Sequence, residues 1–186
     1  LRERFSPEVL EVRVDANGAF LPHEALSRMD RLAALQLHSI EQPITAGQWD
    51  AMARLCRETP LPIALDEELI ALADPLRRDE LLEAISPQFI ILKPALLGGL
   101  RACEDWIALA HAKNMGWWVT SALESNVGLN AIAQWTATLG VVMPQGLGTG
   151  TLYSNNVDSP LQTGDGKLWY RRDQPWKLEK LSKLCT

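Results

Sequence analysis

The sequence predicts an α/β fold and, within that class, a (β/α)8 barrel of the TIM type of which about six βα units are present. Short apolar runs alternate with longer stretches that have helical spacing of apolar residues. Nearly every apolar run ends in a polar residue, at intervals of 25 to 28 residues, which is the length of one strand, one helix and two loops. The glycine fingerprint of a dinucleotide-binding sheet is missing after the first run.

Each predicted strand is a short run rich in Val, Ile, Leu, Phe or Trp. In chain order these runs are Val9–Val14, His38–Ile40, Ile63–Leu65, Phe89–Leu92, Trp117–Thr120 and Val141–Leu147. The predicted helices lie between them, with apolar residues three and four positions apart: Pro22–Leu35, Gln48–Glu58, Asp74–Ile85, Gly99–Asn114 and Val127–Leu139. Asn126 is the predicted N-cap of the last helix.

Distance decides between an open sheet and a closed barrel. Neighbouring strands lie about 4.8 Å apart, so the outermost ends of six strands in an open sheet would be about 24 Å apart. Closure brings all the ends around one mouth, where a single substrate can reach them. We therefore expect a partial barrel domain over residues 1–160 and a tail over residues 161–186. A complete barrel needs about 250 residues, so about two strands are expected outside this sequence.

Charge and composition exclude several classes of protein. The chain has 18 Lys and Arg against 23 Asp and Glu, a net charge of -5, without a long basic cluster, so we expect no nucleic-acid partner. No apolar stretch approaches the roughly 20 residues of a membrane span, so we expect no membrane partner. Cys56, Cys103 and Cys185 lie far apart, which predicts reduced thiols and a cytoplasmic location. The sequence leaves the oligomeric state open.

The polar residues that follow the predicted strands are Asp15, Glu41, Asp66, Lys93, Ser121 and Thr149. The first three are acidic and follow consecutive parallel strands, so their carboxylates are expected side by side. Three oxygen ligands that leave positions for water and substrate suit Mg²⁺, with Mn²⁺ as a second option, whereas zinc would require His or Cys. The alternative is that these acidic residues cap helices or lie in solvated loops.

Lys93 is the only cation in this series, and it follows the strongly apolar run Phe89–Leu92. In a structural role, Lys93 would form a salt bridge to Asp66. In a chemical role, it would supply positive charge or transfer a proton beside a metal-bound anion. A divalent cation that binds a substrate carboxylate stabilises the enediolate formed when the neighbouring carbon loses its proton. Together these groups indicate proton abstraction next to the carboxylate of a small-molecule substrate.

Four motifs, in this order and spacing, resemble the barrel domain of the enolase superfamily, in its muconate-lactonizing subgroup: Val14-Asp-Ala-Asn17, Ile40-Glu-Gln-Pro43, Leu65-Asp-Glu-Glu68 and Leu92-Lys-Pro94. Two further motifs are most similar to the o-succinylbenzoate synthase family within it: Thr120-Ser-Ala-Leu-Glu-Ser-Asn126 and Gln145-Gly-Leu-Gly-Thr-Gly-Thr-Leu-Tyr153. The resemblance extends from about residue 9 to residue 153.

The resemblance implies a role for each matching residue. The Mg²⁺ ligands would be Asp15, Glu41 and Asp66, and Lys93 would stabilise the enediolate as a cation. The implied reaction is Mg²⁺-dependent dehydration to o-succinylbenzoate, an intermediate of menaquinone biosynthesis. Loop residues at substrate-approaching positions are Ser121, Gly148 and Thr149, although residues of these types also serve as turns.

One expected part is missing from the sequence as given. In the family, a partner lysine in a Lys-x-Lys motif removes the substrate proton from the opposite face, and here it would fall about ten residues before Leu1. The N-terminal capping domain of the superfamily is absent too, and the tail over residues 161–186 is expected to contact it. We therefore expect an N-terminally truncated barrel domain that is inactive alone, with activity in a longer parent.

Three alternatives remain beside the synthase. A dipeptide epimerase shares the metal and lysine pair but generally has Asp-x-Asp where this chain has Gly148-Thr-Gly150. An N-succinylamino-acid racemase is harder to exclude, because its substrate also lacks a free ammonium group. A non-catalytic metal-binding fragment is the alternative of a different class, and the missing partner lysine favours it for this chain.

Overall fold

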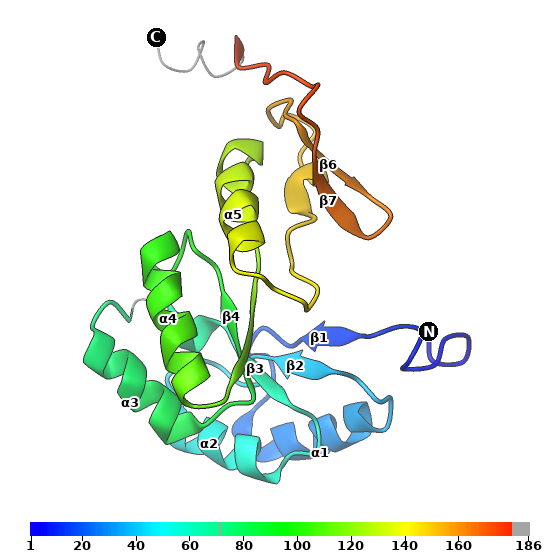
Figure 1. Ribbon diagram of the computed structural model, residues 1–186. Coiled ribbons are helices and arrows are strands. Elements are labelled where there is room, and N and C mark those ends of the chain that lie inside the picture. Colours follow the sequence, from blue (N-terminus) through cyan, green and yellow to red (C-terminus); the bar gives the residue numbers. More distant parts are fainter. Residues whose placement is uncertain (71, 180–186) are drawn as a thin grey trace. The chain divides into compact units, whose positions relative to one another are not determined.

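The computed structural model describes residues 1–70 and 72–179 and confirms the α/β class (Figure 1). One sheet contains β1 (Arg13–Asp15), β2 (Ser39–Glu41), β3 (Ile63–Leu65), β4 (Phe89–Leu92) and β5 (Gly116–Val119). The helices that alternate with these strands are α1 (Pro22–Ala33), α2 (Trp49–Glu58), α3 (Pro75–Ile85), α4 (Leu100–Ala112) and α5 (Asn126–Thr138). A separate antiparallel pair is formed by β6 (Leu161–Gly164) and β7 (Lys167–Tyr170).

The strands of the larger sheet lie in chain order, β1-β2-β3-β4-β5, and β1 to β4 pair in parallel. In a doubly wound sheet this order would reverse at one point, whereas in a barrel each strand lies beside the next one in the chain. The observed order therefore agrees with the predicted barrel type. It also places the carboxyl ends of β1 to β4 along one edge.

The core of this sheet is formed by continuous apolar strands. All of β3 and most of β4 are buried, as is usual for parallel strands that are covered on both faces. α1, α2 and α3 lie along one face of the strands (Figure 1). Their fully buried side chains include Met29, Met52, Leu55, Leu81 and Leu82. The strand ends are thus held by a packed layer of helices.

The described chain divides into two compact units. The first consists of residues 1–92 and 104–117, with β1 to β4 and α1 to α3. The second begins with residues 93–103 and continues from residue 118, with α5, β6 and β7. Asp15, Glu41 and Asp66 belong to the first unit, and Lys93, Ser121, Gly148 and Thr149 to the second.

The first strand is shorter than predicted. Val9–Val14 was expected, but β1 begins at Arg13 and ends at Asp15. The N–H groups of Val9 and Leu10 both donate to the Ser6 carbonyl, at 3.1 and 3.0 Å, which forms a turn where the strand was expected to begin. This turn takes up backbone groups that a strand would need for its ladder.

The predicted sixth strand, Val141–Leu147, is wrong. It is reduced to one parallel bridge between Thr120 and Gly146, so five strands and not six are formed in this part of the described chain. Val142 is fully exposed, and Pro144 has no N–H to donate to a ladder. Apolar content alone therefore predicted a strand that this segment does not form.

The β6–β7 hairpin was not predicted as a hairpin, only as an extended tail. Its turn residues, Asp165 and Gly166, both have positive φ, 52° and 70°. Two consecutive residues with positive φ form the type I′ turn that matches the twist of antiparallel strands, and Asp-Gly is a preferred pair for it. The Asp165-Gly166 dipeptide was therefore a sequence signal for the hairpin.

The remaining predicted strands and helices occur within two residues of their expected ends. The N-cap of α5 differs, because the helix begins at Asn126 and the N-cap is Ser125. The Asn126 N–H donates to Oδ1 of Asn156 at 2.8 Å, and the Asn126 side chain donates to the Val157 carbonyl at 2.6 Å. A distant segment thus supplies the cap that the local sequence was expected to provide.

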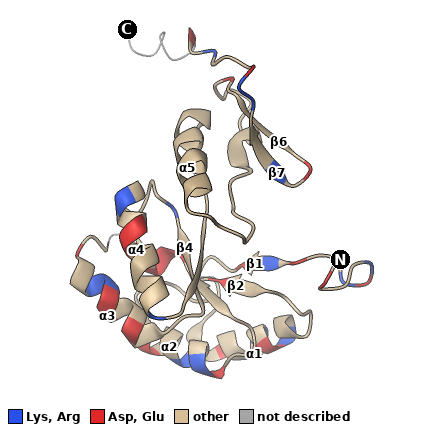
Figure 2. Ribbon diagram, in the orientation of Figure 1, with Lys and Arg blue, Asp and Glu red and all other residues tan. Residues whose placement is uncertain are grey.

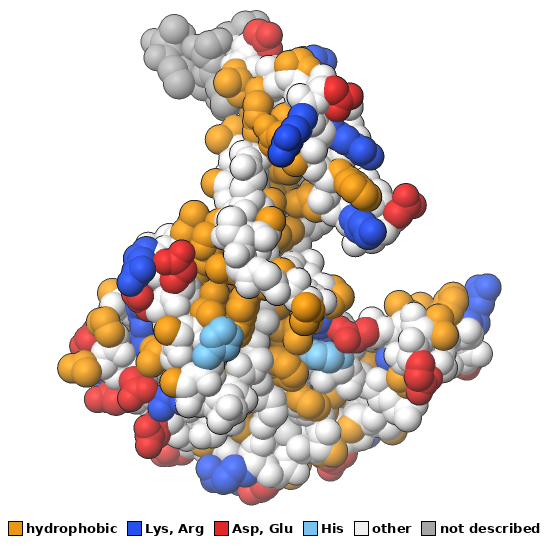
Figure 3. Space-filling model, viewed as in Figure 1, with side chains coloured by type: hydrophobic (Ala, Val, Ile, Leu, Met, Phe, Trp, Pro, Cys, Tyr) orange, Lys and Arg blue, Asp and Glu red, His pale blue; other side chains and the backbone are white. Residues whose placement is uncertain are grey.

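The surface and the cysteines agree with the composition. Lys and Arg alternate with Asp and Glu over α1 to α4, whereas α5 carries no charged residue (Figures 2 and 3). None of the described helices combines the length and apolar character needed to cross a bilayer. Cys56 and Cys103 are buried and are not joined in a disulfide, and burial raises the pKa of Cys56 to about 12. Cys185 lies outside the described residues.

His38 is expected to make stability depend on pH. Burial lowers the pKa of its imidazole, which packs 4.9 Å from the Phe89 ring between centroids. The folded chain disfavours the protonated ring. The contribution of neutral His38 to the free energy of unfolding is therefore fully present above about pH 6.5 and is lost as the pH falls below that value. Thermal midpoints of the unchanged chain and of His38→Gln, measured from about pH 7.5 to 5.5, should show a shallower fall for the variant. Parallel curves would contradict this role.

Candidate functional site

Three carboxylates, Asp15, Glu41 and Asp66, lie along the carboxyl edge of the first unit; we call them the acidic edge. Asp15 and Glu41 are the last residues of β1 and β2 and stand opposite each other in the parallel register. Glu41 is in turn opposite Ala64, two positions before Asp66. Because side chains alternate with a period of two along a strand, the register assigns all three positions to the same face of the sheet.

The environment of the acidic edge changes from strand to strand. Asp15 is exposed, and its Oδ1 accepts a hydrogen bond of 2.8 Å from the Asn17 N–H. Glu41 is half-buried, and Asp66 is only 2% exposed. Such a gradient gives one solvent-facing carboxylate and one that is held inside the protein.

The donor chemistry of the acidic edge fits a hard divalent cation, since all three ligands are carboxylate oxygens on consecutive strand ends. Their side chains are not, however, gathered into a ready ion site. Within residues 1–70 and 72–179, no group of three or more His, Cys, Asp or Glu side chains is placed so that it could hold a metal ion. The structure therefore brings these residues to one edge without closing them around one point.

The loop after β1 is hydrogen-bonded to the loop after β2. The Ala16 N–H donates to the Glu41 carbonyl at 3.0 Å, and the Gly18 N–H donates to the Gln42 carbonyl at 2.7 Å. Gly18 has a φ of 70°, and a Cβ there would lie 3.0 Å from Cα of Thr45. Glycine is therefore required at position 18 for the two loops to approach, and their approach holds Asp15 beside Glu41.

A fourth carboxylate, Glu68, is buried and lies two residues after Asp66. Burial raises the pKa of Glu68, while hydrogen bonds from the Gly47 N–H and from the Trp49 and Gln42 side chains oppose that rise. The Gly47 N–H lies 3.1 and 3.0 Å from the two carboxylate oxygens. Glu68 belongs to the Leu65-Asp-Glu-Glu68 motif, but no role for it was predicted from the sequence. The unusual run of three acidic residues after an apolar strand was the available signal.

Lys93 follows β4 directly in the chain and is half-buried. Its carbonyl accepts hydrogen bonds from the N–H groups of Leu96 and Leu97, at 2.9 and 3.1 Å. These bonds begin a tight turn at the point where the strand ends. Lys93 thus occupies the predicted strand-end position, one residue beyond an apolar strand.

In the second unit the structure brings Ser121 and Thr149 together. The Thr149 hydroxyl donates to Oγ of Ser121 at 2.8 Å, and the Leu123 N–H donates to the same oxygen at 2.8 Å. The Ser121 hydroxyl itself donates to Oε2 of Glu124 at 2.6 Å. One proton and two lone pairs are all that a hydroxyl offers. Ser121 is therefore fully engaged within the chain, while Thr149 keeps acceptor capacity.

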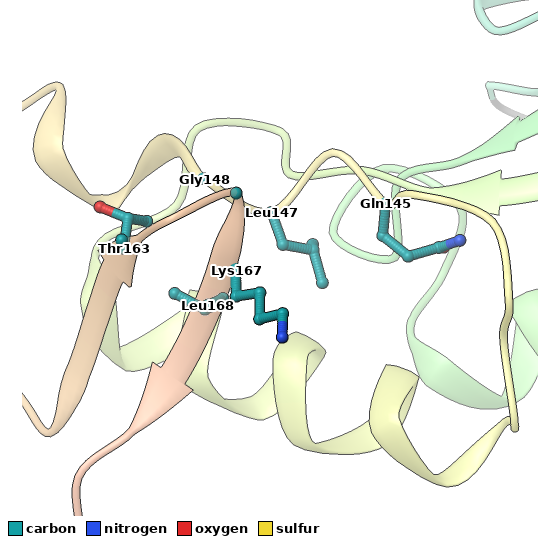
Figure 4. A pocket seen from close by; sticks show the side chains of 8 residues that line it. Gln145, Leu147, Gly148, Thr163, Lys167 and Leu168 are labelled. Atoms are coloured by element: carbon teal, nitrogen blue, oxygen red, sulfur yellow. The ribbon is translucent and has the colours of Figure 1, made fainter. Parts of the chain in front are cut away.

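Gly148, the third loop residue predicted to contact substrate, lines a pocket of about 390 Å³ between the 145–148 segment and the β6–β7 hairpin (Figure 4). Leu147 and Leu168 give this pocket apolar walls, and Lys167 and Thr163 add polar groups. Gly148 is exposed there. The pocket can thus receive a small molecule that has both apolar and anionic parts.

The two glycines of this segment should respond differently to a methyl group. A Cβ at Gly146 would lie 2.3 Å from Oγ1 of Thr120, whereas a Cβ at Gly148 would meet nothing closer than the Thr163 methyl at 3.9 Å. Gly146→Ala is expected to destabilise the chain by about 1–3 kcal/mol. Gly148→Ala should leave the thermal midpoint nearly unchanged. Equal midpoints for the two variants would show that the Thr120–Gly146 approach is not tight.

Comparison with known proteins identifies the family. Residues 1–174 match the family model described as "Enolase C-terminal domain-like". The o-succinylbenzoate synthase of Desulfotalea psychrophila is 58% identical over 168 residues, which is 90% of this chain and 45% of that protein. The o-succinylbenzoate synthase of Thermobifida fusca is 34% identical over 164 residues, which is 87% of this chain and 49% of that protein.

Solved structures give the same result. The crystal structure of MenC from Desulfotalea psychrophila has a TM-score of 0.87 and 59% identity, and covers 90% of this chain and 47% of that chain. Muconate lactonizing enzyme from Pseudomonas putida has a TM-score of 0.80 and 27% identity, over 90% of this chain and 46% of that chain. The chain thus spans about half the length of these relatives. The chain belongs to the enolase C-terminal domain-like family.

Proposed function

We propose that the protein carrying this sequence is a carbon–oxygen lyase of the o-succinylbenzoate synthase type, which dehydrates a small carboxylate substrate in menaquinone biosynthesis. The observation that carries this proposal is the 58% identity to the synthase of Desulfotalea psychrophila over 90% of this chain. The acidic edge at consecutive strand ends supports it, because this reaction class needs a site for a divalent cation.

In this proposal Asp15, Glu41 and Asp66 would hold Mg²⁺, or Mn²⁺ in its place. The bound cation supplies positive charge to a substrate carboxylate whose neighbouring carbon loses a proton. Asp66 is buried and held by the protein, whereas Asp15 is exposed. We therefore assign Asp66 the role of a fixed ligand and Asp15 that of a ligand that moves more freely.

Lys93 is assigned the role of a cation that stabilises the enediolate. The reaction removes a proton next to the carboxylate and hydroxide from the adjacent carbon, so that a double bond forms and water is lost. Negative charge accumulates on the carboxylate before hydroxide leaves. An ammonium group placed at a strand end lowers the energy of that charge without having to transfer a proton itself.

In the second unit, Thr149 and Gly148 are proposed to contact the substrate. Thr149 retains lone pairs that can accept a hydrogen bond, and Gly148 exposes its backbone in the pocket beside Lys167. Ser121 has no free donor, so its proposed part in substrate binding is to hold the Thr149 hydroxyl in place.

The proposed reaction is tested by incubating the protein with the synthase substrate and with an N-succinylamino acid in deuterated water. Loss of water from the synthase substrate, dependent on Mg²⁺ and abolished by EDTA, is the expected result. Deuterium incorporation into the N-succinylamino acid, without any dehydration, would instead identify a racemase. Mn²⁺ binding without turnover of either compound would identify a non-catalytic metal-binding protein, and both results would contradict the synthase proposal.

A further inference from the structure

Gln42, the residue after Glu41, has an unusual backbone for its position. It is 1% exposed, and its φ is 36°, in the left-handed region that residues other than glycine seldom adopt. It also precedes Pro43, and a residue before proline prefers an extended backbone. A conformation of this kind persists only where surrounding contacts hold it, and such positions cluster at functional sites.

The backbone of Gln42 connects the ends of three strands. Its N–H donates to the Ala64 carbonyl in β3 at 3.0 Å, and its carbonyl accepts the Gly18 N–H from the loop after β1 at 2.7 Å. Gln42 itself follows the last residue of β2. The backbone of one residue therefore ties together the segments that carry the acidic edge.

The Gln42 side chain extends this connection to Asp66. Its Oε1 accepts the Asp66 N–H at 3.2 Å, and its Nε2 donates to the Ile44 carbonyl at 3.0 Å. It also lowers the pKa of the Glu68 carboxyl. The amide oxygen and one amide proton are thereby engaged. Asp66 lies where β3 ends and a 3-10 turn begins, with φ of -123° and ψ of -75°, so its backbone direction depends on this bond.

We propose that Gln42 is a positioning residue, which fixes the backbone of Asp66 relative to Glu41 and so sets the spacing of two metal ligands. This inference rests on the proposed function, because it presumes that the acidic edge binds a divalent cation. Gln42 touches neither substrate nor cation in it. Its effect passes through the Asp66 N–H, which donates to the Gln42 amide oxygen and would lose that bond if the oxygen were removed.

Gln88 provides a matched control in the same unit. Its Oε1 accepts the Ile63 N–H at 2.9 Å, and its Nε2 donates to the Cys56 carbonyl at 3.1 Å. These are the same kinds of hydrogen bond as those of Gln42, made at the amino end of β3 and not at its carboxyl end. A variant at Gln88 therefore removes equivalent bonds at a distance from the acidic edge.

The test compares Gln42→Met and Gln88→Met in the full chain, since methionine keeps the length of the side chain and removes its hydrogen bonds. Mn²⁺ affinity is measured from the EPR signal of free Mn²⁺, the thermal midpoint from circular dichroism, and protection of the Asp66 amide by hydrogen exchange. Gln42→Met is expected to weaken Mn²⁺ binding about 10-fold to 100-fold and to expose the Asp66 amide to exchange. Gln88→Met should lower the thermal midpoint while leaving Mn²⁺ affinity and Asp66 protection unchanged.

Several outcomes would overturn the inference. Unchanged Mn²⁺ affinity in Gln42→Met, or equal loss of affinity in both variants, would show that Gln42 contributes stability alone. Absence of Mn²⁺ binding to the unchanged chain would overturn the proposed metal site, and the inference with it. If Gln42→Met does not fold, Gln42→Asn, which keeps the amide but shortens the side chain by one methylene, is measured in the same way and must also weaken binding.

Discussion

In the protein that carries this sequence, Lys93→Met is expected to lower kcat for dehydration by about 10³-fold while Mn²⁺ affinity stays nearly unchanged. Methionine keeps the unbranched apolar stem of Lys93 but removes the ammonium group. If that ammonium stabilises the enediolate, its loss raises the barrier of proton abstraction and leaves the carboxylate ligands in place. The measurements are steady-state kinetics with saturating Mg²⁺ and, separately, Mn²⁺ titration of the variant.

Lys113→Met is the matched control for this experiment. Lys113 follows α4 and forms ion pairs with Asp79 at 3.0 Å and Glu83 at 3.2 Å, and these partners raise its pKa. Exposed ion pairs of this kind contribute about 0–1 kcal/mol, so a small loss of stability and normal kcat are expected. Normal turnover by Lys93→Met would contradict the proposed role. Loss of Mn²⁺ binding in that variant would show that Lys93 acts on the ligands and not on the reacting carbon.

The sequence located the acidic edge because parallel register is regular. Once strands of similar length repeat, the residue that ends each strand must lie at a common edge, and Asp15 opposite Glu41 confirms this. The hydrogen-bond contacts of Gln42 and Glu68 were not predictable in the same way. They depend on a left-handed backbone at Gln42 and on hydrogen bonds to Gly18, Gly47 and Asp66, which no local pattern encodes.

Errors in the predicted elements have a similar cause. Val141–Leu147 has the apolar content of a strand, but Pro144 and the close approach of Gly146 to Thr120 limit its pairing to one bridge. The acceptor for the first N–H of α5 comes from Asn156, thirty residues later in the chain. By contrast, the Asp165-Gly166 turn was a local signal that could have been recognised. Periodicity therefore predicts which segments form elements, and side-chain contacts between distant segments decide where the elements end.

Trp106→Ala is expected to destabilise the first unit by about 3–5 kcal/mol. Trp106 is fully buried in α4, and the guanidinium of buried Arg78 lies 5.4 Å from its ring. Removal of the ring would leave a cavity beneath Arg78. Nε of Arg78 donates to the Leu72 carbonyl at 2.7 Å, and this hydrogen bond keeps the side chain from moving into the cavity. The measurement is urea unfolding followed by circular dichroism.

Trp106→Phe separates the packing of this ring from its polar group. Nε1 of Trp106 is buried and has no hydrogen-bond partner within residues 1–70 and 72–179, so the indole N–H costs stability where it lies. Phenylalanine removes that cost and keeps most of the apolar contact with the Arg78 guanidinium. The Phe variant should therefore lose much less stability than the Ala variant. Equal losses in the free energy of unfolding of the two variants would contradict this prediction. They would show that the indole N–H is hydrogen-bonded in solution and that the packing of the Trp106 ring against Arg78 does not decide the stability of α4.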